Sequence, residues 1–340
     1  MDVIDRGSWD ILFPGGLDEA GGKAEYMKKI ANANFIYENR HPDEIEENTY
    51  AASAVNAVSK ALDLPWETVY RSLIAQSQAF AHMPENMVCV NRMLRDHSFF
   101  LYPKRKTERL SADTVCAYMQ KHCQSGVSAI VRVDGNNIGG DMLAIAPALI
   151  DGKIKYKIFG VSDCSTGYLI SEIWLHWSDG GCHCPDIPKP RSVNPRILKS
   201  GRIPASHEFF EYRQENPLNR ITKDCVLRAI ASACEISWNE VLDRLSKFRL
   251  VTVNHTYVIE NLLHQMGYVS FETDPAVTGT EFCRIATRYY QNGERLILHL
   301  GNAHMAAMLP YQTEKGVVQY RITDNYDSSN ETVTKYWVHP

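Results

Sequence analysis

The chain contains "CVLRAIASACEISWNEVLDRL" (225–245), and it contains a related stretch earlier, "SAVNAVSKALDLPWETVYRSL" (53–73). Five of the 21 aligned positions are identical, including a tryptophan at the same place in each. In both stretches apolar residues recur at helical spacing, a short break follows, and helical spacing then resumes. Each stretch is therefore predicted to form two consecutive helices, and the chain is predicted to contain an internal duplication.

The segments that follow each stretch also correspond, in the same order and with small gaps. A further helical segment comes first, and it is followed by several runs rich in β-forming residues. The matched pairs are 89–100 with 258–271, 125–133 with 292–300, 141–147 with 304–310, 153–165 with 316–329, and 171–177 with 334–340. Helices followed by strands are typical of an α+β domain, so each copy is predicted to pack its helices on an antiparallel sheet.

This correspondence sets the predicted domain boundaries. The first copy spans 47–177 and the second spans 207–340, and a linker rich in Gly, Pro and Ser joins them at 178–206. Residues 1–46 match neither copy. They are predicted to form an N-terminal extension that packs on the first copy.

Composition narrows the possible functions. The 340 residues are 44% hydrophobic with a formal charge of −4, and no dense basic stripe occurs, so a nucleic-acid partner is not expected. No stretch approaches the roughly 20 apolar residues that span a bilayer. The first residues lack the pattern of a secretory signal, and the nine cysteines lack the spacing of a disulfide scaffold. These features predict a cytoplasmic protein in a reducing compartment.

Cys225 is the first candidate for chemistry, because it stands where polar residues give way to the helical pattern. Thr222 or Asp224 could cap this helix, and the unpaired N–H groups of its first turn favour an anion. Such a setting lowers the pKa of a thiol, and the thiolate is the reactive form. A small buried side chain is the alternative interpretation of an isolated cysteine.

A thiolate nucleophile needs a base, and His304 is the best candidate. It opens the strand "HMAAMLP" after a loop of small residues, whereas the competing His299 lies inside an apolar strand. Asp324 ends the next predicted strand and could orient the imidazole, with Asn325 as a substitute. A catalytic triad of Cys225, His304 and Asp324 is therefore predicted.

A cysteine on a helix, then a histidine on a strand, then an aspartate or asparagine on the next strand resembles the papain-like cysteine peptidases over about residues 207–340. The resemblance implies two tandem papain-like domains, peptidase or isopeptidase activity, a protein or peptide substrate, and no cofactor. It also implies a side-chain donor to the oxyanion about six residues before the cysteine, where Asn219 stands. The sequence departs from the best-known members, since it has no Gln at that position.

The first copy lacks the same groups. In the alignment Cys225 is replaced by Ser53, and the positions of His304 and Asp324 are taken by Asp141 and Gly160. A serine without an imidazole partner is a weak nucleophile, so the first copy is predicted to be catalytically inactive.

Two other functions remain open on the sequence alone. The same triad could transfer an acyl group to an amine, as transglutaminase-like enzymes do, or both copies could be inactive scaffolds in an interaction or assembly protein, for example of a virus or mobile element. A zinc site at "CHC" (182–184) with Cys164 and His176 is not predicted, because its spacing fits no common pattern.

Overall fold

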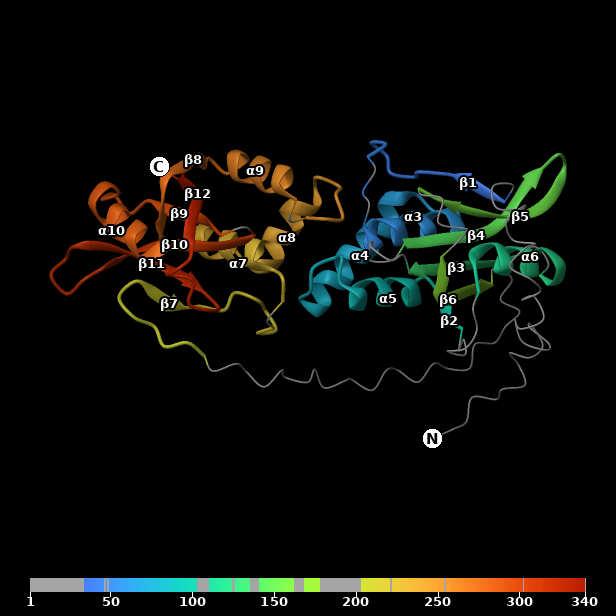
Figure 1. Ribbon diagram of the computed structural model, residues 1–340, viewed down its shortest axis with the longest axis horizontal. Helices are drawn as coiled ribbons and strands as arrows, with labels where there is room; N and C mark the ends of the chain where they lie inside the picture. Colours follow the sequence, from blue (N-terminus) through green and yellow to red (C-terminus); the bar gives the residue numbers. More distant parts are fainter. Residues whose placement is uncertain are drawn as a thin grey trace, which may run out of the picture. The chain divides into compact units, whose positions relative to one another are not determined.

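The structure is a computed structural model in which two compact units can be distinguished (Figure 1). The first unit comprises Met1–Gln76 and Pro84–Asp186, and the second comprises Ser77–Met83 and Ile187–Pro340. The residues that the structure describes are 34–45, 47, 49–102, 110–123, 126–134, 141–161, 168–177, 203–220, 222–253, 255–301 and 303–339. Among them, no helix is both long and apolar enough to span a membrane.

Both units have the same order of elements. The first contains β1 (Phe35–Tyr37), α3 (Tyr50–Leu62), α4 (Trp66–Phe80, whose residues 77–80 are assigned to the second unit), α5 (Met87–Asp96), β2 (Phe100–Leu101), α6 (Ala112–His122), β3 (Val127–Asp134), β4 (Asp141–Ile150), β5 (Lys153–Gly160) and β6 (Leu169–Trp177). The second contains β7 (Phe210–Tyr212), α7 (Cys225–Cys234), α8 (Trp238–Ser246), α9 (Thr256–Gln265), β8 (Val269–Thr278), α10 (Gly279–Tyr289), β9 (Arg295–Leu300), β10 (His304–Gln312), β11 (Val318–Asp324) and β12 (Thr332–His339).

The two sheets also have the same strand order. It is β1-β5-β4-β3-β6-β2 in the first unit and β7-β11-β10-β9-β12-β8 in the second, so each strand has a counterpart at the same place. The chain is therefore α+β, with helices packed on a largely antiparallel sheet in each unit. The predicted antiparallel sheet is mixed at one edge of each unit, because β1 pairs in parallel with β5 and β7 pairs in parallel with β11.

The first strand of each sheet corrects the predicted N-terminal extension. β1 lies within residues 1–46, which were assigned to neither copy, yet it is the counterpart of β7. Strands of three residues carry too little alternation to be recognised in a sequence. The rest of that extension up to residue 33, and residues 178–202 of the predicted linker, lie outside the described residues.

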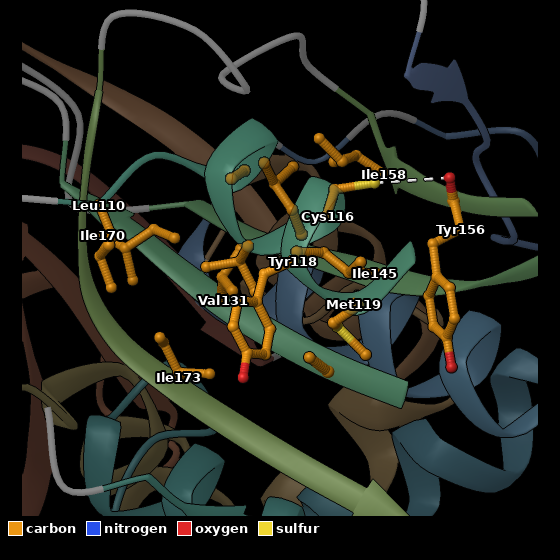
Figure 2. Close-up of a cluster of buried hydrophobic side chains, with 14 of the residues drawn as sticks. Leu110, Cys116, Tyr118, Met119, Val131, Ile145, Tyr156, Ile158, Ile170 and Ile173 are labelled. Atoms are coloured by element: carbon orange, nitrogen blue, oxygen red, sulfur yellow. Dashed lines mark hydrogen bonds between the residues drawn. The ribbon is translucent and has the colours of Figure 1, made fainter. Parts of the chain in front are cut away.

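Each sheet carries helices on both faces. In the first unit α6 packs on one face through a cluster of buried side chains that includes Cys116, Val131 and Ile145, and the Cys116 thiol donates to the Tyr156 carbonyl at 3.4 Å (Figure 2). Because successive strand residues point to opposite faces, Ala144 and its alternate neighbours face the other side, where α3 lies against β4.

The second unit repeats this arrangement. Helix α10 packs on one face through Phe282 and Cys283 with Leu298, and α7 lies against β10 on the other. The helix α7 begins where β10 begins and β11 ends. Cys225 and His304 are the first residues of α7 and β10, and Asp324 is the last residue of β11. These residues, separated by up to 99 positions in the chain, therefore lie at the same end of adjacent elements.

Candidate active site

Cys225 is the first residue of α7, and no side chain caps the start of that helix. The N-cap residue is Asp224, but its carboxylate makes no capping hydrogen bond. Thr222 does not cap either, since its hydroxyl oxygen is buried without a partner among the described residues. The helix therefore starts after Asp224, one of the two predicted cap residues, but neither predicted side chain makes the capping hydrogen bond. The half-buried sulfur of Cys225 therefore lies at the positive end of a helix whose first N–H groups no side chain caps.

His304 links the thiol to a carboxylate. Its Nε2 lies 2.5 Å from Asp324 Oδ2, and its ring also hydrogen-bonds the Cys225 side chain. Because Nε2 is engaged by Asp324, Nδ1 is the nitrogen that faces the sulfur. The Tyr326 ring lies against the imidazole with its centroid 4.8 Å away, and the Tyr326 hydroxyl donates to Glu331 at 2.8 Å. The imidazole is thus fixed on three sides.

The Asp324 carboxylate is buried and fully engaged. Besides His304, it accepts hydrogen bonds from Arg228 Nη1 at 2.6 Å, from the Asn325 backbone N–H at 2.7 Å and from the Ser328 hydroxyl at 3.2 Å. Its side chain is 1% exposed. Asp324 therefore occupies the orienting position, and Asn325 contributes its backbone N–H to that carboxylate.

Arg228 and Asp224 form a buried support that sequence reasoning missed. Arg228 Nε donates to Asp224 Oδ1 at 3.0 Å, so one guanidinium joins the residue before Cys225 to the residue that holds His304. Asp224 also accepts from Asn216 Nδ2 at 2.8 Å and from Trp238 Nε1 at 3.0 Å. The available signal was an arginine on the apolar face of a helix, four residues after an aspartate.

The charges of this network set the protonation of the site. Burial would raise the pKa of the Cys225 thiol, but the hydrogen bonds from His304 and the Met305 backbone, with the charges of His304 and Arg228, hold that pKa below its usual value. Burial would lower the pKa of His304, but hydrogen bonds to Asp324 and Cys225 raise it to about 9. Burial would raise the pKa of Asp324, but the hydrogen bonds and charges of His304 and Arg228 hold that pKa below its usual range. The lowered pKa of the thiol and the raised pKa of the imidazole both favour a thiolate–imidazolium pair.

A cleft of about 570 Å³ opens beside the thiol. Its wall combines apolar side chains from α7, α9, β10 and β12 with a few polar groups. The lining residues are Cys225, Val226, Thr256, Ile259, Glu260, Glu272, His299, Ala303, Met305, Thr334, Lys335 and Trp337. His299, the competing base, belongs to this wall and bonds Thr334 Oγ1 through Nδ1 at 2.7 Å.

Asn219 is not among the residues that line this cleft. It lies in an exposed turn with a φ of 51°, and its backbone N–H donates to the Asn216 carbonyl at 2.9 Å. Its side chain makes no hydrogen bond within the described part of the chain. Its role as a side-chain donor to the oxyanion stays a prediction.

The strand registers identify the first-unit counterparts of the triad. Asp141 pairs with Val133 as His304 pairs with Leu300, each at the first residue of the equivalent strand. Gly160 pairs with Tyr37 as Asp324 pairs with Tyr212, each at the last residue. The alignment of Asp141 with His304 and of Gly160 with Asp324 agrees with both registers.

Ser53 occupies the place of Cys225. Its hydroxyl oxygen accepts the Met142 backbone N–H at 2.9 Å, and Cys225 accepts the N–H of Met305, which is the counterpart of Met142. Ser53 also donates to the Tyr50 carbonyl at 2.9 Å. A serine bonded in this way, with no imidazole at the equivalent of His304, lacks the base that a nucleophilic hydroxyl needs.

The buried support is missing from the first unit as well. Ala52 and Asn56 stand at the positions of Asp224 and Arg228 in the matched helix. The ion network therefore accompanies the triad and is not needed by the shared scaffold.

No group of three or more His, Cys, Asp or Glu side chains within the described ranges is arranged to hold a metal ion, and residues 182–184 fall outside those ranges. Comparisons with protein-family models, with curated proteins and with solved structures found no match for this chain.

Proposed function

We propose that the second unit is a papain-like cysteine hydrolase that cleaves peptide or isopeptide bonds, and that the first unit is its inactive relative. The observation that supports this most is the hydrogen-bonded series from the Cys225 thiol through His304 to the buried Asp324. A structural cysteine has no need of an imidazole that is itself held by a carboxylate.

The proposed reaction has two steps. The Cys225 thiolate attacks the carbonyl carbon, and the backbone N–H of Cys225 at the open helix end stabilises the oxyanion. The His304 imidazolium then gives its proton to the leaving amine, and a thioester remains. In the second step His304 takes a proton from water as that water attacks the thioester, and the acid and the thiolate are released with the imidazolium restored.

Alkylation by iodoacetamide at about pH 6 tests the thiolate. An ordinary thiol with a pKa of about 8.5 is almost fully protonated there, so Cys225 is expected to react at least about tenfold faster than a free cysteine. Cys116 and Cys283 are controls within the chain, because burial raises the pKa of each to about 12. Equal labelling of wild type and Cys225→Ala, read by mass spectrometry of the cysteine-containing peptides, would count against the proposal.

A further inference from the structure

Trp337 carries an unused hydrogen-bond donor in the cleft that Cys225 also lines. It lies on β12, lines the same cleft as Cys225 and is 4% exposed. Its indole N–H is the one buried side-chain polar group, among the described residues of that cleft, that has no hydrogen-bond partner. Buried donors are almost always paired, so an unpaired one next to a reactive group calls for an explanation.

The first unit shows what this N–H normally bonds. Trp174 is the counterpart of Trp337, because it pairs with Ile130 as Trp337 pairs with Ile297. There the indole N–H donates to Glu172 Oε2 at 3.2 Å, two residues back along the same strand.

In the second unit the counterpart of Glu172 is Lys335, which offers no acceptor. Residues two apart on a strand share a face, and Lys335 lines the cleft. The replacement therefore leaves the N–H of Trp337 free on the side of the sheet where Cys225 lies.

The charges around Lys335 indicate which acceptor fits. Its ammonium lies 2.5 Å from Glu260 and 3.5 Å from Glu272, so two carboxylates face one cation and a further anion is disfavoured. Val226, Ile259 and Met305 add apolar wall. For the peptide or isopeptide substrate of the proposed hydrolase, the neutral acceptor that fits this wall is a backbone carbonyl.

We propose that Trp337 Nε1 binds a neutral backbone carbonyl of the substrate next to Cys225. This assignment rests on the proposed hydrolase function and specifies its substrate as an extended peptide chain. The Lys335 ammonium lies 5.3 Å from the centroid of the Trp337 ring, and its side chain is 23% exposed. Ion pairs with that much exposure are weak, so an entering peptide can displace the lysine from the indole.

The test compares two electrophiles that both alkylate Cys225. One is a pool of uncharged tetrapeptide chloromethyl ketones, and the other is iodoacetamide, which is too small to reach Trp337. Wild type is expected to react with the tetrapeptide pool at least about tenfold faster than with acetyl-alanine chloromethyl ketone. Trp337→Phe is expected to lose about tenfold of the tetrapeptide rate while its iodoacetamide rate stays within about twofold.

Two variants at Lys335 separate the donor from general effects on folding. Lys335→Glu restores the acceptor found in the first unit, so it is expected to lower the tetrapeptide rate as Trp337→Phe does. Lys335→Met removes the charge but leaves the N–H free, and it is expected to keep that rate. Trp174→Phe, the same change in the first unit, is the matched control and is expected to leave both rates unchanged.

Tetrapeptide rates that are the same in wild type, Trp337→Phe and Lys335→Glu would overturn the inference. So would a wild type that reacts equally fast with the tetrapeptide and single-residue reagents. In both cases normal labelling of Cys225 by iodoacetamide would leave the proposed hydrolase intact. Failure of both reagents to label Cys225 would instead contradict the hydrolase proposal itself.

Discussion

His304→Ala is expected to lower the rate of hydrolysis of an activated ester such as 4-nitrophenyl acetate by about 10²–10⁴-fold. The variant loses the proton donor and acceptor of both steps. It also loses the hydrogen bond and the positive charge that hold the pKa of Cys225 down. Because burial alone raises that pKa, the alkylation rate of the variant at about pH 6 is expected to fall as well, and to recover only in alkaline solution.

Two further variants make this result specific. Asp324→Asn keeps the shape of the side chain but removes the anion that raises the pKa of His304. Its rates of ester hydrolysis and of alkylation are therefore expected to lie between those of wild type and His304→Ala. His299→Ala changes the other histidine of the cleft, which bonds Thr334, and it is expected to leave the pH profile of alkylation unchanged. A His304→Ala protein that alkylates at pH 6 as fast as wild type would show that the imidazole does not hold the thiolate.

Arg228→Ala is expected to lower the free energy of unfolding by about 3–5 kcal/mol, which is the usual cost of removing one partner from a buried ion pair. The side chains of Arg228, Asp224 and Asp324 are 6%, 0% and 1% exposed, so the loss leaves the buried Asp224 carboxylate without a cation and leaves Asp324 with His304 alone. Denaturant unfolding followed by tryptophan fluorescence measures the change, because Trp238 donates to Asp224.

The first unit supplies the control for this prediction. The double variant Asp224→Ala with Arg228→Asn introduces the residue types that the first unit has at Ala52 and Asn56. It removes the Asp224 carboxylate together with the arginine that neutralises it. It is expected to be more stable than Arg228→Ala. Arg244→Ala, which breaks an exposed pair with Glu240 on α8, is expected to cost less than about 1 kcal/mol. A double variant less stable than Arg228→Ala would contradict the proposed role of the buried charges.

Much of the fold could be predicted from the sequence because the periodic patterns are long. The helical stretches at 53–73 and 225–245 and the matched strand segments correspond to equivalent elements in two sheets of identical strand order. The parallel edge strands could not be predicted. β1 and β7 are three residues each and are separated from their partners by more than 100 positions, and local patterns contain no information about such pairing.

The site was partly accessible for the same reason. Cys225, His304 and Asp324 stand at the ends of helices and strands that have clear sequence patterns. The ends of neighbouring strands and of the helix packed on them come together at one end of the sheet. Asn219 was placed only by counting six residues back from Cys225, and it lies in an exposed left-handed turn outside the lining of the cleft. Arg228 was missed because an arginine in an apolar helix face gives no indication in sequence that it joins a carboxylate 96 positions away, although Asp224 at four residues before it was a local signal.

Trapping of the thioester tests the central claim most directly. Wild type is mixed with 4-nitrophenyl acetate at about pH 6 and quenched in acid within the first turnover, and the cysteine-containing peptides are analysed by mass spectrometry. We predict a burst of 4-nitrophenol equal to the protein concentration and one acetyl group on the peptide that contains Cys225. Acetylation that appears only on other residues, or a burst that persists in Cys225→Ala, would contradict the account.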